Sequence, residues 1–410
     1  MSVSTAGHPP VVSSRTPLAA RSDLALGVEV LSSFEEAHAL WDRLTIEGTV
    51  SAYQGFAWVE SYFRHVEAAE GARAALIVLR DGSGEPLLLL PLAVHDTGSG
   101  RIARFIGGKH SNFHLPLIGR NAGRIDGKAL RAALLDAGRS AGIDLYSFSN
   151  QPLEWEGTAN PMALLGGLAS PSAGYKLALE ADGEAMLTAR LSKDRRRKMR
   201  QKDTKLATLG TVTYRKAATD EEAMGILTAF FAQKAERFQD QGIDDPFASP
   251  AVRAFLSDMA TRRDARGKPV LDLYALMLDE RPVAIYGAVE DGIRYSGVVT
   301  AFDSDDAVAR CTPGESLLMQ MIRDCCARGL RTFDLGVGES RYKMVICDQT
   351  EPLIDTSLAV TLRGRLAALR ESAFIVAKRL VKQSAPGQAL IALVRKLKKA
   401  KSGEPSAAEA

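Results

Sequence analysis

Two stretches of the chain repeat one pattern, and this repetition is what most constrains the fold. Each begins with a glycine, runs through an apolar helical segment, reaches a second glycine fifteen residues later and continues into a short strand; the glycine pairs are Gly127/Gly142 and Gly314/Gly329. A glycine just past a helix is a common left-handed helix end. The equal spacing indicates an internal duplication.

The same order of elements precedes both stretches. Spacing of apolar residues predicts two helices and then an antiparallel meander of three strands, at 34–48, 56–66 and 73–108 in the first half and at 219–240, 250–267 and 270–303 in the second. Thr219 and Glu222 fit a capping box at the start of one helix. We therefore expect an α/β (α+β) protein with two tandem domains, each a mixed, mostly antiparallel sheet flanked by helices.

Composition sets the expected boundaries. Residues 1–24 are rich in Ser, Pro and Ala, which is typical of a disordered segment, and residues 363–401 carry eleven Lys or Arg and one Glu, with Leu, Ile and Val on one helical face. The expected division is a disordered 1–24, a first domain at 25–170, a second at 171–362 and a basic amphipathic helical tail at 363–410.

Several motifs together resemble a known family. The order of helices, meander, Pro-Gly turn, helix and strand, with "CTPGESLLMQMI" and "FDLGVGESRYK" in the second half, is similar to the GNAT acyltransferase fold. It looks like the CelD-like group (cellulose biosynthesis protein CelD), and the Fem-type peptidyl transferases are related. The resemblance covers roughly residues 28–350 and implies an acyltransferase whose second domain is active. The first copy has "GRIDGKAL" and Asp126 at the corresponding place, so it is expected to be a degenerate scaffold.

The resemblance implies acetyl-CoA or another acyl-CoA as the acyl donor, with its pyrophosphate at a helix start, where free N–H groups and the helix dipole favour an anion. The expected binding segment is Arg310, Thr312, Pro313, Gly314, Glu315 and Ser316. It departs from the family's motif, since the spacing from the Arg is one residue longer and Glu315 would repel a phosphate. An ordinary Pro-Gly turn before a helix is the alternative.

Acyl transfer needs a base for the acceptor, an N–H group for the oxyanion and an acid for the leaving thiolate. Tyr342 is the candidate acid, and the candidate bases are Asp334, Glu339 and Asp303. Lys343 is a candidate for binding an anionic substrate, and Gly336 and Gly338 would let a ligand approach the backbone. In the first domain, His110, Asn112 and His114 are candidate substrate contacts from a loop facing the cleft between domains. For each residue a purely structural role is the alternative.

Other classes of protein are disfavoured. The net charge is only +3, and four Cys without zinc spacing, far from all six His, argue against a metal site. Because no signal peptide or membrane span is evident, a cytoplasmic location is expected, with peripheral membrane contact through the basic tail as one interpretation. Residues 190–205 hold nine Lys or Arg, which would suit CoA phosphates, an anionic glycan precursor or an RNA backbone, or form only a solvated helix.

The sequence thus predicts a GNAT-type acyltransferase that moves an acyl group from acyl-CoA to an amine or hydroxyl. The group suggests a small-molecule or glycan-precursor acceptor in polysaccharide or cell-envelope assembly. Two alternatives stay open. One is peptidyl transfer from aminoacyl-tRNA, the one reading that involves a nucleic acid, and the other is a non-catalytic scaffold of a membrane-bound synthase.

Overall fold

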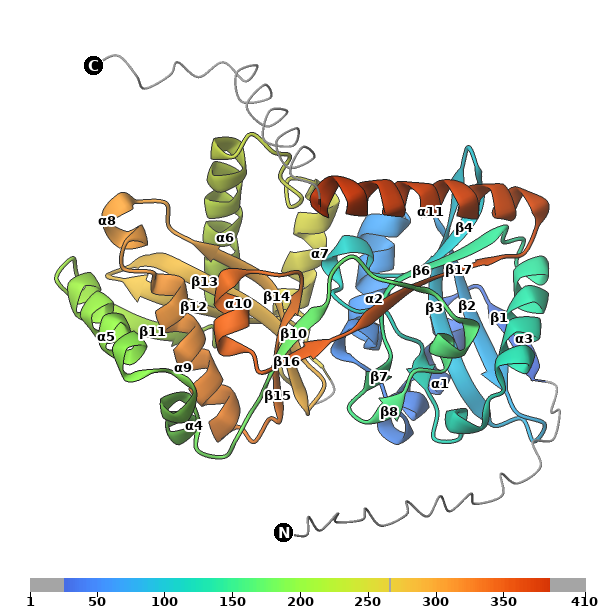
Figure 1. Cartoon of the computed structure of the whole chain (residues 1–410), viewed down its shortest axis with the longest axis horizontal. Helices are drawn as coiled ribbons and strands as arrows, with labels where there is room; N and C mark the ends of the chain where they lie inside the picture. Colours follow the sequence, from blue (N-terminus) through green and yellow to red (C-terminus); the bar gives the residue numbers. More distant parts are fainter. Residues whose placement is uncertain (1–25, 265–266, 384–410) are drawn as a thin grey trace, which may run out of the picture.

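The computed structural model describes residues 26–264 and 267–383. It has two lobes, each built on one sheet with helices packed against it, and the two lobes lie side by side (Figure 1). The expected disordered segment 1–24 and the end of the basic tail, 384–410, lie outside the described residues. No helix in the described part of the chain is long and apolar enough to cross a membrane.

The first sheet has the strand order β1-β2-β3-β4-β6-β17-β9, with β5 paired to β3. Its strands are β1 Gly27–Leu31, β2 Arg73–Arg80, β3 Pro86–Thr97, β4 Gly100–Phe105, β5 Leu117–Ile118, β6 Leu145–Pro152, β9 Leu168–Ala169 and β17 Leu353–Ala359. Helices α1 (Phe34–Glu47), α2 (Phe56–Tyr62) and α3 (Gly127–Ser140) accompany it, and a hairpin of β7 (Glu154–Trp155) and β8 (Thr158–Ala159) follows β6.

The second sheet has the order β11-β12-β13-β14-β15-β10-β16. Its strands are β10 Gly174–Ala178, β11 Val212–Lys216, β12 Asp272–Leu278, β13 Arg281–Glu290, β14 Arg294–Phe302, β15 Thr332–Val337 and β16 Gln349–Glu351. Its helices are α4 Gly183–Arg190, α5 Lys193–Ala207, α6 Asp220–Asp240, α7 Pro250–Thr261, α8 Asp306–Ala309, α9 Pro313–Ala327 and α10 Arg341–Ile346.

The predicted duplication is confirmed. In each sheet a strand leads into two helices, a three-stranded meander and a further helix, and the chain returns as a strand parallel to the last meander strand: β4 with β6, and β14 with β15. Local sequence explains the helix starts. Asp126 caps α3, and the Thr219 hydroxyl accepts a hydrogen bond from the Glu222 N–H at the start of α6, as the capping-box pattern predicts.

One hydrophobic cluster extends across both lobes. Helices α2 and α7 pack against each other between the sheets, and the rings of Trp58 and Phe255 meet edge to face with their centroids 4.8 Å apart. Trp41 and Leu227, from α1 and α6, belong to the same buried cluster. Burial of large aromatic side chains across the contact stabilises a fixed arrangement of the two lobes.

One predicted boundary needs correction. The segment assigned to the second domain, 171–362, includes β17, which pairs antiparallel with β6 and therefore completes the first sheet. Helix α11 (Leu362–Gln383) then runs along the outside of the first lobe (Figure 1). Because β4 pairs with one edge of β6, the other edge would expose free backbone groups, and the returning β17 pairs with them.

The start of α11 yields a stability prediction. A Cβ atom on Gly364 would lie 1.7 Å from the Asp144 carbonyl oxygen, so helix and strand would have to separate. We expect Gly364→Ala to lower the free energy of unfolding by about 2 kcal/mol, measured by urea denaturation. The matched control is Gly225→Ala, in the exposed part of α6 with open space around its Cβ position. That control should stabilise the protein by about 0.5 kcal/mol, and equal effects of both substitutions would contradict the prediction.

Candidate active site at the strand opening of the second sheet

The parallel strands β14 and β15 stay together over only three residue pairs. Arg294, Tyr295 and Ser296 lie opposite Thr332, Phe333 and Asp334, and beyond Ser296 and Asp334 the strands diverge. We call this divergence the strand opening. It leaves the facing backbone groups of both strands without ladder partners, so they are available to another group.

A side chain from the first lobe bridges the strand opening. The Asn112 Nδ2 group donates to the Gly297 carbonyl oxygen on β14 at 2.7 Å, and its Oδ1 accepts from the Val337 N–H on β15 at 3.4 Å. Tyr53, also from the first lobe, donates its hydroxyl to the same Gly297 oxygen at 3.0 Å. The first domain therefore forms one wall of the opening, and Asn112, predicted as a cleft-facing residue, lies within it.

Two glycines make this close approach sterically feasible. A Cβ atom on Gly336 would lie 2.6 Å from Asn112 Nδ2, and one on Gly297 would lie 2.2 Å from the Tyr286 hydroxyl. Gly336 also has a positive φ of 76°, which disfavours any residue with a side chain. In this structure the close neighbour of Gly336 is Asn112, and the approach of a ligand to the Gly336 backbone stays a prediction. Gly338 has a φ of 99° and donates its N–H to the Ala173 carbonyl.

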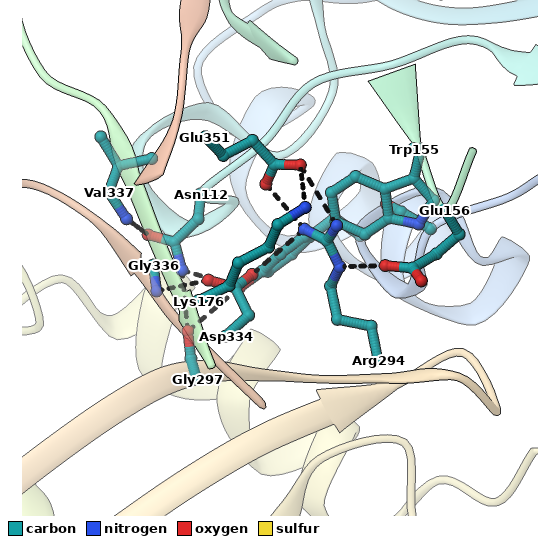
Figure 2. A network of polar contacts seen from close by, with 12 residues as sticks. Asn112, Trp155, Glu156, Lys176, Arg294, Gly297, Asp334, Gly336, Val337 and Glu351 are labelled. Carbon is teal, nitrogen blue, oxygen red and sulfur yellow. Dashed lines mark hydrogen bonds and ion pairs between the residues drawn. The ribbon is translucent and has the colours of Figure 1, made fainter. Parts of the chain in front are cut away.

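Beside the opening lies a group that we call the buried arginine cluster: Arg294, Glu351, Glu156, Asp334 and Lys176 (Figure 2). The Arg294 guanidinium is fully buried and binds Glu351 through two nitrogens, at 2.8 and 3.2 Å, and Glu156 at 2.8 Å. Its Cζ lies 3.6 Å from the centre of the Trp155 ring. Burial alone would lower the pKa of Arg294, but its hydrogen bonds and charge interaction with Glu351 raise it.

Asp334 is the carboxyl group that lies at the strand opening itself. It is fully buried at the last pair before the opening, and its Oδ1 accepts the Gly336 N–H at 2.6 Å. Its Oδ2 accepts no hydrogen bond from any described residue and lies 3.9 Å from Arg294 Nη1. Burial raises the pKa of this carboxyl to about 6, against the lowering effect of Arg294. At neutral pH it is therefore an ionised carboxylate that can accept a proton.

Lys343 and Tyr342 lie on α10, directly after β15. Lys343 is buried and donates to the Gly336 and Val337 carbonyl oxygens at 3.2 Å each, and burial lowers its pKa. Tyr342 is half-buried, and burial raises its pKa. The fold thus places Asp334 on β15, and it places Tyr342 and Lys343 on the helix that follows this strand.

The other two predicted bases lie elsewhere. Glu339 is exposed in the loop between β15 and α10. Asp303 follows the far end of β14, seven residues beyond Ser296, which corresponds to about 23 Å along a strand. There it pairs with Arg281 at 3.1 Å and accepts the Asp305 N–H at 2.8 Å. The structure does not bring Asp303 to Asp334, and its contacts are those of a loop anchor.

The two histidines of the first-domain loop are also placed away from the opening. His110 is buried against Tyr62, 3.0 Å from its hydroxyl, and burial lowers its pKa to about 4. The His114 ring lies 3.0 Å from the Ser149 carbonyl oxygen and stacks on Phe105. Of the three loop residues, only Asn112 contacts the second sheet's opening.

The start of α9, predicted to bind the CoA pyrophosphate, is covered by side chains of α5. Thr312 has a left-handed backbone and accepts from Lys202, Glu315 pairs with Arg195 at 3.1 Å, and Ser316 donates to Asp203. Pro313 is buried at the first position of the helix, and the Cβ position of Gly314 is open. Arg310 ends the intervening helix α8, is exposed and pairs with Asp306. Two carboxylates thus stand at the helix start, and the nearby cations come from α5.

A cavity of about 430 Å³ adjoins this region. Arg190, Arg195, Lys198 and Asp194 from the α4–α5 segment line it, together with Val345 of α10. Because α10 also carries Lys343, one short helix connects the basic cavity with the strand opening. Arg190 already pairs with Asp348 and Arg195 with Glu315, so Lys198 is the lining cation that pairs with no carboxylate of the described residues, and it favours an anionic ligand.

All four cysteines are free thiols, and burial raises the pKa of three of them, Cys325, Cys326 and Cys347. Among the described residues, Glu67, Glu70 and His95 of the first lobe form a group with ligand-type atoms within 4.8 Å of one another. Within it, Glu67 and His95 already pair at 2.8 Å.

Sequence reasoning missed Tyr53, Tyr286, Arg294 and Glu351. In the sequence, Arg294 is a cation at the start of a strand, between Ile293 and Tyr295. Its partners Glu156 and Glu351 lie 138 and 57 residues away along the chain, and no local pattern connects them.

The buried arginine cluster generates the first prediction for the site. Glu351→Gln removes the carboxylate that binds both Arg294 and Lys176, and leaves a buried cation with reduced compensation. We expect the free energy of unfolding to fall by about 3 kcal/mol, measured by chemical denaturation. The control Glu339→Gln changes the same group at an exposed position and should change it by less than about 0.5 kcal/mol. A loss no larger than the control's would contradict a structural role for the cluster.

The second prediction concerns pH. Folded Asp334 holds its proton to about pH 6, whereas the ordinary value is 3.8. Between these values the folded state binds more protons than the unfolded state, so this group lowers the free energy of unfolding as pH rises. Between pH 4 and pH 7 the free energy of unfolding of the wild type should therefore fall by up to about 3 kcal/mol relative to that of Asp334→Asn. Denaturation of both proteins across this range tests it, and a pH-independent difference would show that Asp334 does not titrate there.

Comparisons with known proteins agree with this architecture. Residues 193–344, from α5 to α10, match the family model described as "Acetyltransferase (GNAT) domain". The comparison with curated proteins found no match. The crystal structure of FemX is similar with a TM-score of 0.56 and 11% identity, over 83% of this chain and 99% of that chain. A conserved protein of unknown function from Bacteroides thetaiotaomicron is similar with a TM-score of 0.52 and 12% identity, over 81% of this chain and 100% of that chain.

The strand opening and the basic helix α5 both fall within the matched segment, and the two structural similarities extend over both lobes. Residues 193–344 therefore match the model of an acetyltransferase (GNAT) domain, and the chain as a whole has a two-lobed fold similar to that of FemX.

Proposed function

We propose that the second lobe transfers an acyl group from acyl-CoA to an amine or hydroxyl, with the reaction at the strand opening. The observation that carries this proposal is the divergence of β14 and β15 in the segment that matches the GNAT domain, with Asp334, Lys343 and Asn112 gathered around it. An unpaired strand edge offers N–H groups that can hydrogen-bond a developing oxyanion.

In the proposed reaction the acceptor nitrogen or oxygen attacks the thioester carbonyl carbon. The new bond forms at that carbon, the C–S bond breaks, and CoA leaves as a thiolate. Asp334, ionised at neutral pH and with one oxygen that accepts no hydrogen bond from the described residues, is the candidate base for the acceptor's proton. Tyr342, whose pKa is raised by burial and which therefore stays protonated, is the candidate acid for the thiolate.

The Val337 N–H and the Asn112 amide are the candidate oxyanion donors. At 3.4 Å the hydrogen bond between them is long, so a substrate oxygen that takes the Val337 N–H would displace a weak contact. In that arrangement Asn112 contributes to the site from the first domain.

The phosphates of CoA are proposed to bind in the α5–α10 cavity rather than at Arg310. Arg190, Arg195 and Lys198 line this cavity, whereas Arg310 is exposed at the end of α8. Glu315 and Asp203 would repel a phosphate placed directly on the start of α9.

A second candidate is transfer from aminoacyl-tRNA, and the exposed side of α5 favours it. Lys193, Arg197, Lys198, Arg200 and Lys205 are all exposed on this one helix, an arrangement that suits a phosphate backbone. Under either donor, the resemblance to CelD-like and Fem-type proteins suggests an acceptor from polysaccharide or cell-envelope assembly. A scaffold without catalysis is the remaining alternative.

The first experiment is calorimetric titration of the protein with acetyl-CoA and a longer acyl-CoA. Wild type should bind with micromolar affinity, and Lys198→Glu should weaken binding about tenfold or more, because it places a negative charge in the phosphate cavity. Lys205→Glu is the matched control on the same helix, about 10 Å further along. It should leave the affinity within about twofold at physiological salt, since exposed charges that far apart are largely screened.

The outcomes separate the candidates. Equal weakening by both substitutions would indicate a diffuse charge effect and contradict a phosphate site in the cavity. If neither acyl-CoA binds, titration with aminoacyl-tRNA at several salt concentrations follows, and a steep salt dependence would favour the tRNA donor. If the protein binds none of these donors, the scaffold without catalysis is the interpretation that remains.

A further inference from the structure

Helix α11 carries an apolar stripe that faces solvent. Leu362, Leu366 and Leu369 are exposed by 74, 63 and 67%, the largest values for leucines in the described chain. They follow one another at spacings of four and three residues, so they lie on one side of the helix. Single exposed apolar residues are ordinary, but an aligned row of them marks a binding surface.

The opposite side of α11 is the one attached to the protein. Gly364 approaches the Asp144 carbonyl, Ala367 is buried, and Glu371 forms an ion pair with Arg104 of β4. The stripe of leucines is therefore not the side of α11 that packs against the first sheet. In Figure 1 the helix runs along the outside of the first lobe, where it contacts β4, β6 and β17.

Cations border the stripe. Arg363, Arg365 and Arg370 are exposed on α11, and its one acidic residue in this part, Glu371, is already paired. An occupant must therefore accept leucine side chains and supply negative charge. Leucines flanked by arginines on the exposed side of a surface helix have the chemistry of an interfacial membrane anchor.

The charge of each candidate partner indicates which of them fits this surface of leucines and arginines. The end of this chain, 384–410, has five Lys or Arg and two Glu, so it adds positive charge to an already positive surface. A second copy would oppose the same arginines to each other across a two-fold contact. A bilayer with anionic lipids satisfies both the leucines and the arginines.

We propose that α11 docks the protein onto the surface of a membrane rich in anionic lipids, with Leu362, Leu366 and Leu369 inserted at the headgroup level and Arg363 and Arg370 against lipid phosphates. The helix lies in the plane of the interface, and its other side holds the first lobe. This function is independent of acyl transfer, so its failure would leave the proposed reaction untouched.

The test is sedimentation of the full chain with two kinds of vesicle, phosphatidylcholine alone and phosphatidylcholine with phosphatidylglycerol. Wild type should bind the anionic vesicles and much less the neutral ones, with binding reduced by salt. Leu366→Glu with Leu369→Glu should weaken binding at least about tenfold, and Arg363→Gln with Arg370→Gln about tenfold. The control is Ile46→Glu, a substitution of an isolated residue of α1 that is 81% exposed, and it should leave binding unchanged.

Several results would overturn the proposal. They are absence of binding to anionic vesicles, equal binding to both vesicle types, or binding that the double Leu variant retains. A concentration-dependent dimer in sedimentation velocity, lost in the double Leu variant, would assign the stripe to a second copy. If an introduced Leu366→Cys thiol resists labelling in the vesicle-free full chain, the chain's own end covers the stripe. Thermal unfolding of each variant confirms that these exposed substitutions leave the protein folded.

Discussion

The buried guanidinium of Arg294 is the interaction on which the arrangement of the two lobes and the site depends. It lies at the beginning of β14, and its partners come from the β7–β8 hairpin, from β16 and from β15. A fully desolvated cation is stable only if its partners are held in place, so the position of each of these segments depends on the others. The same cation lowers the pKa of Asp334 while burial raises it. The chemistry of the opening and the joining of the lobes therefore share one residue.

The parts of this fold that could be predicted from sequence are those encoded locally. The cap at Thr219 and the glycines after the two matched helices depend on residues within a few positions of each other, and they identified the duplication correctly. The return of β17 to the first sheet could not be read in this way, because its partner β6 lies some two hundred residues earlier and its apolar pattern suits either sheet. Similarly, the sequence offers Asp334 as a candidate base, but its pKa depends on burial and on Arg294, and neither is visible in the strand itself.

The start of α9 shows how a motif can be present in sequence and have different contacts in the fold. Helix α8 separates β14 from α9, so Arg310 ends one helix instead of preceding the other, and its side chain faces solvent. Meanwhile α5 lies across the start of α9 and provides Arg195 and Lys202 there. Cations from an adjoining helix can replace a cation from the loop, because an anion responds to the local field and not to the segment that generates it. This replacement is why the proposed phosphate site is assigned to α5.

A single loop accounts for the difference between the two copies. In the first sheet β4 and β6 also diverge, and the loop that follows β4 occupies the resulting edge: the His114 N–H donates to the Asn150 carbonyl, and its ring contacts Ser149. Two residues earlier, the same loop extends Asn112 into the opening of the second sheet. The first opening is filled by main chain, which only unfolding of the loop could displace. The second is bridged by one side chain, which a ligand can displace at the cost of a few hydrogen bonds. In the duplicated fold the opening of the first sheet is thus closed, whereas the opening of the second sheet is accessible to a ligand. The first lobe supplies Asn112, the side chain that covers the second opening.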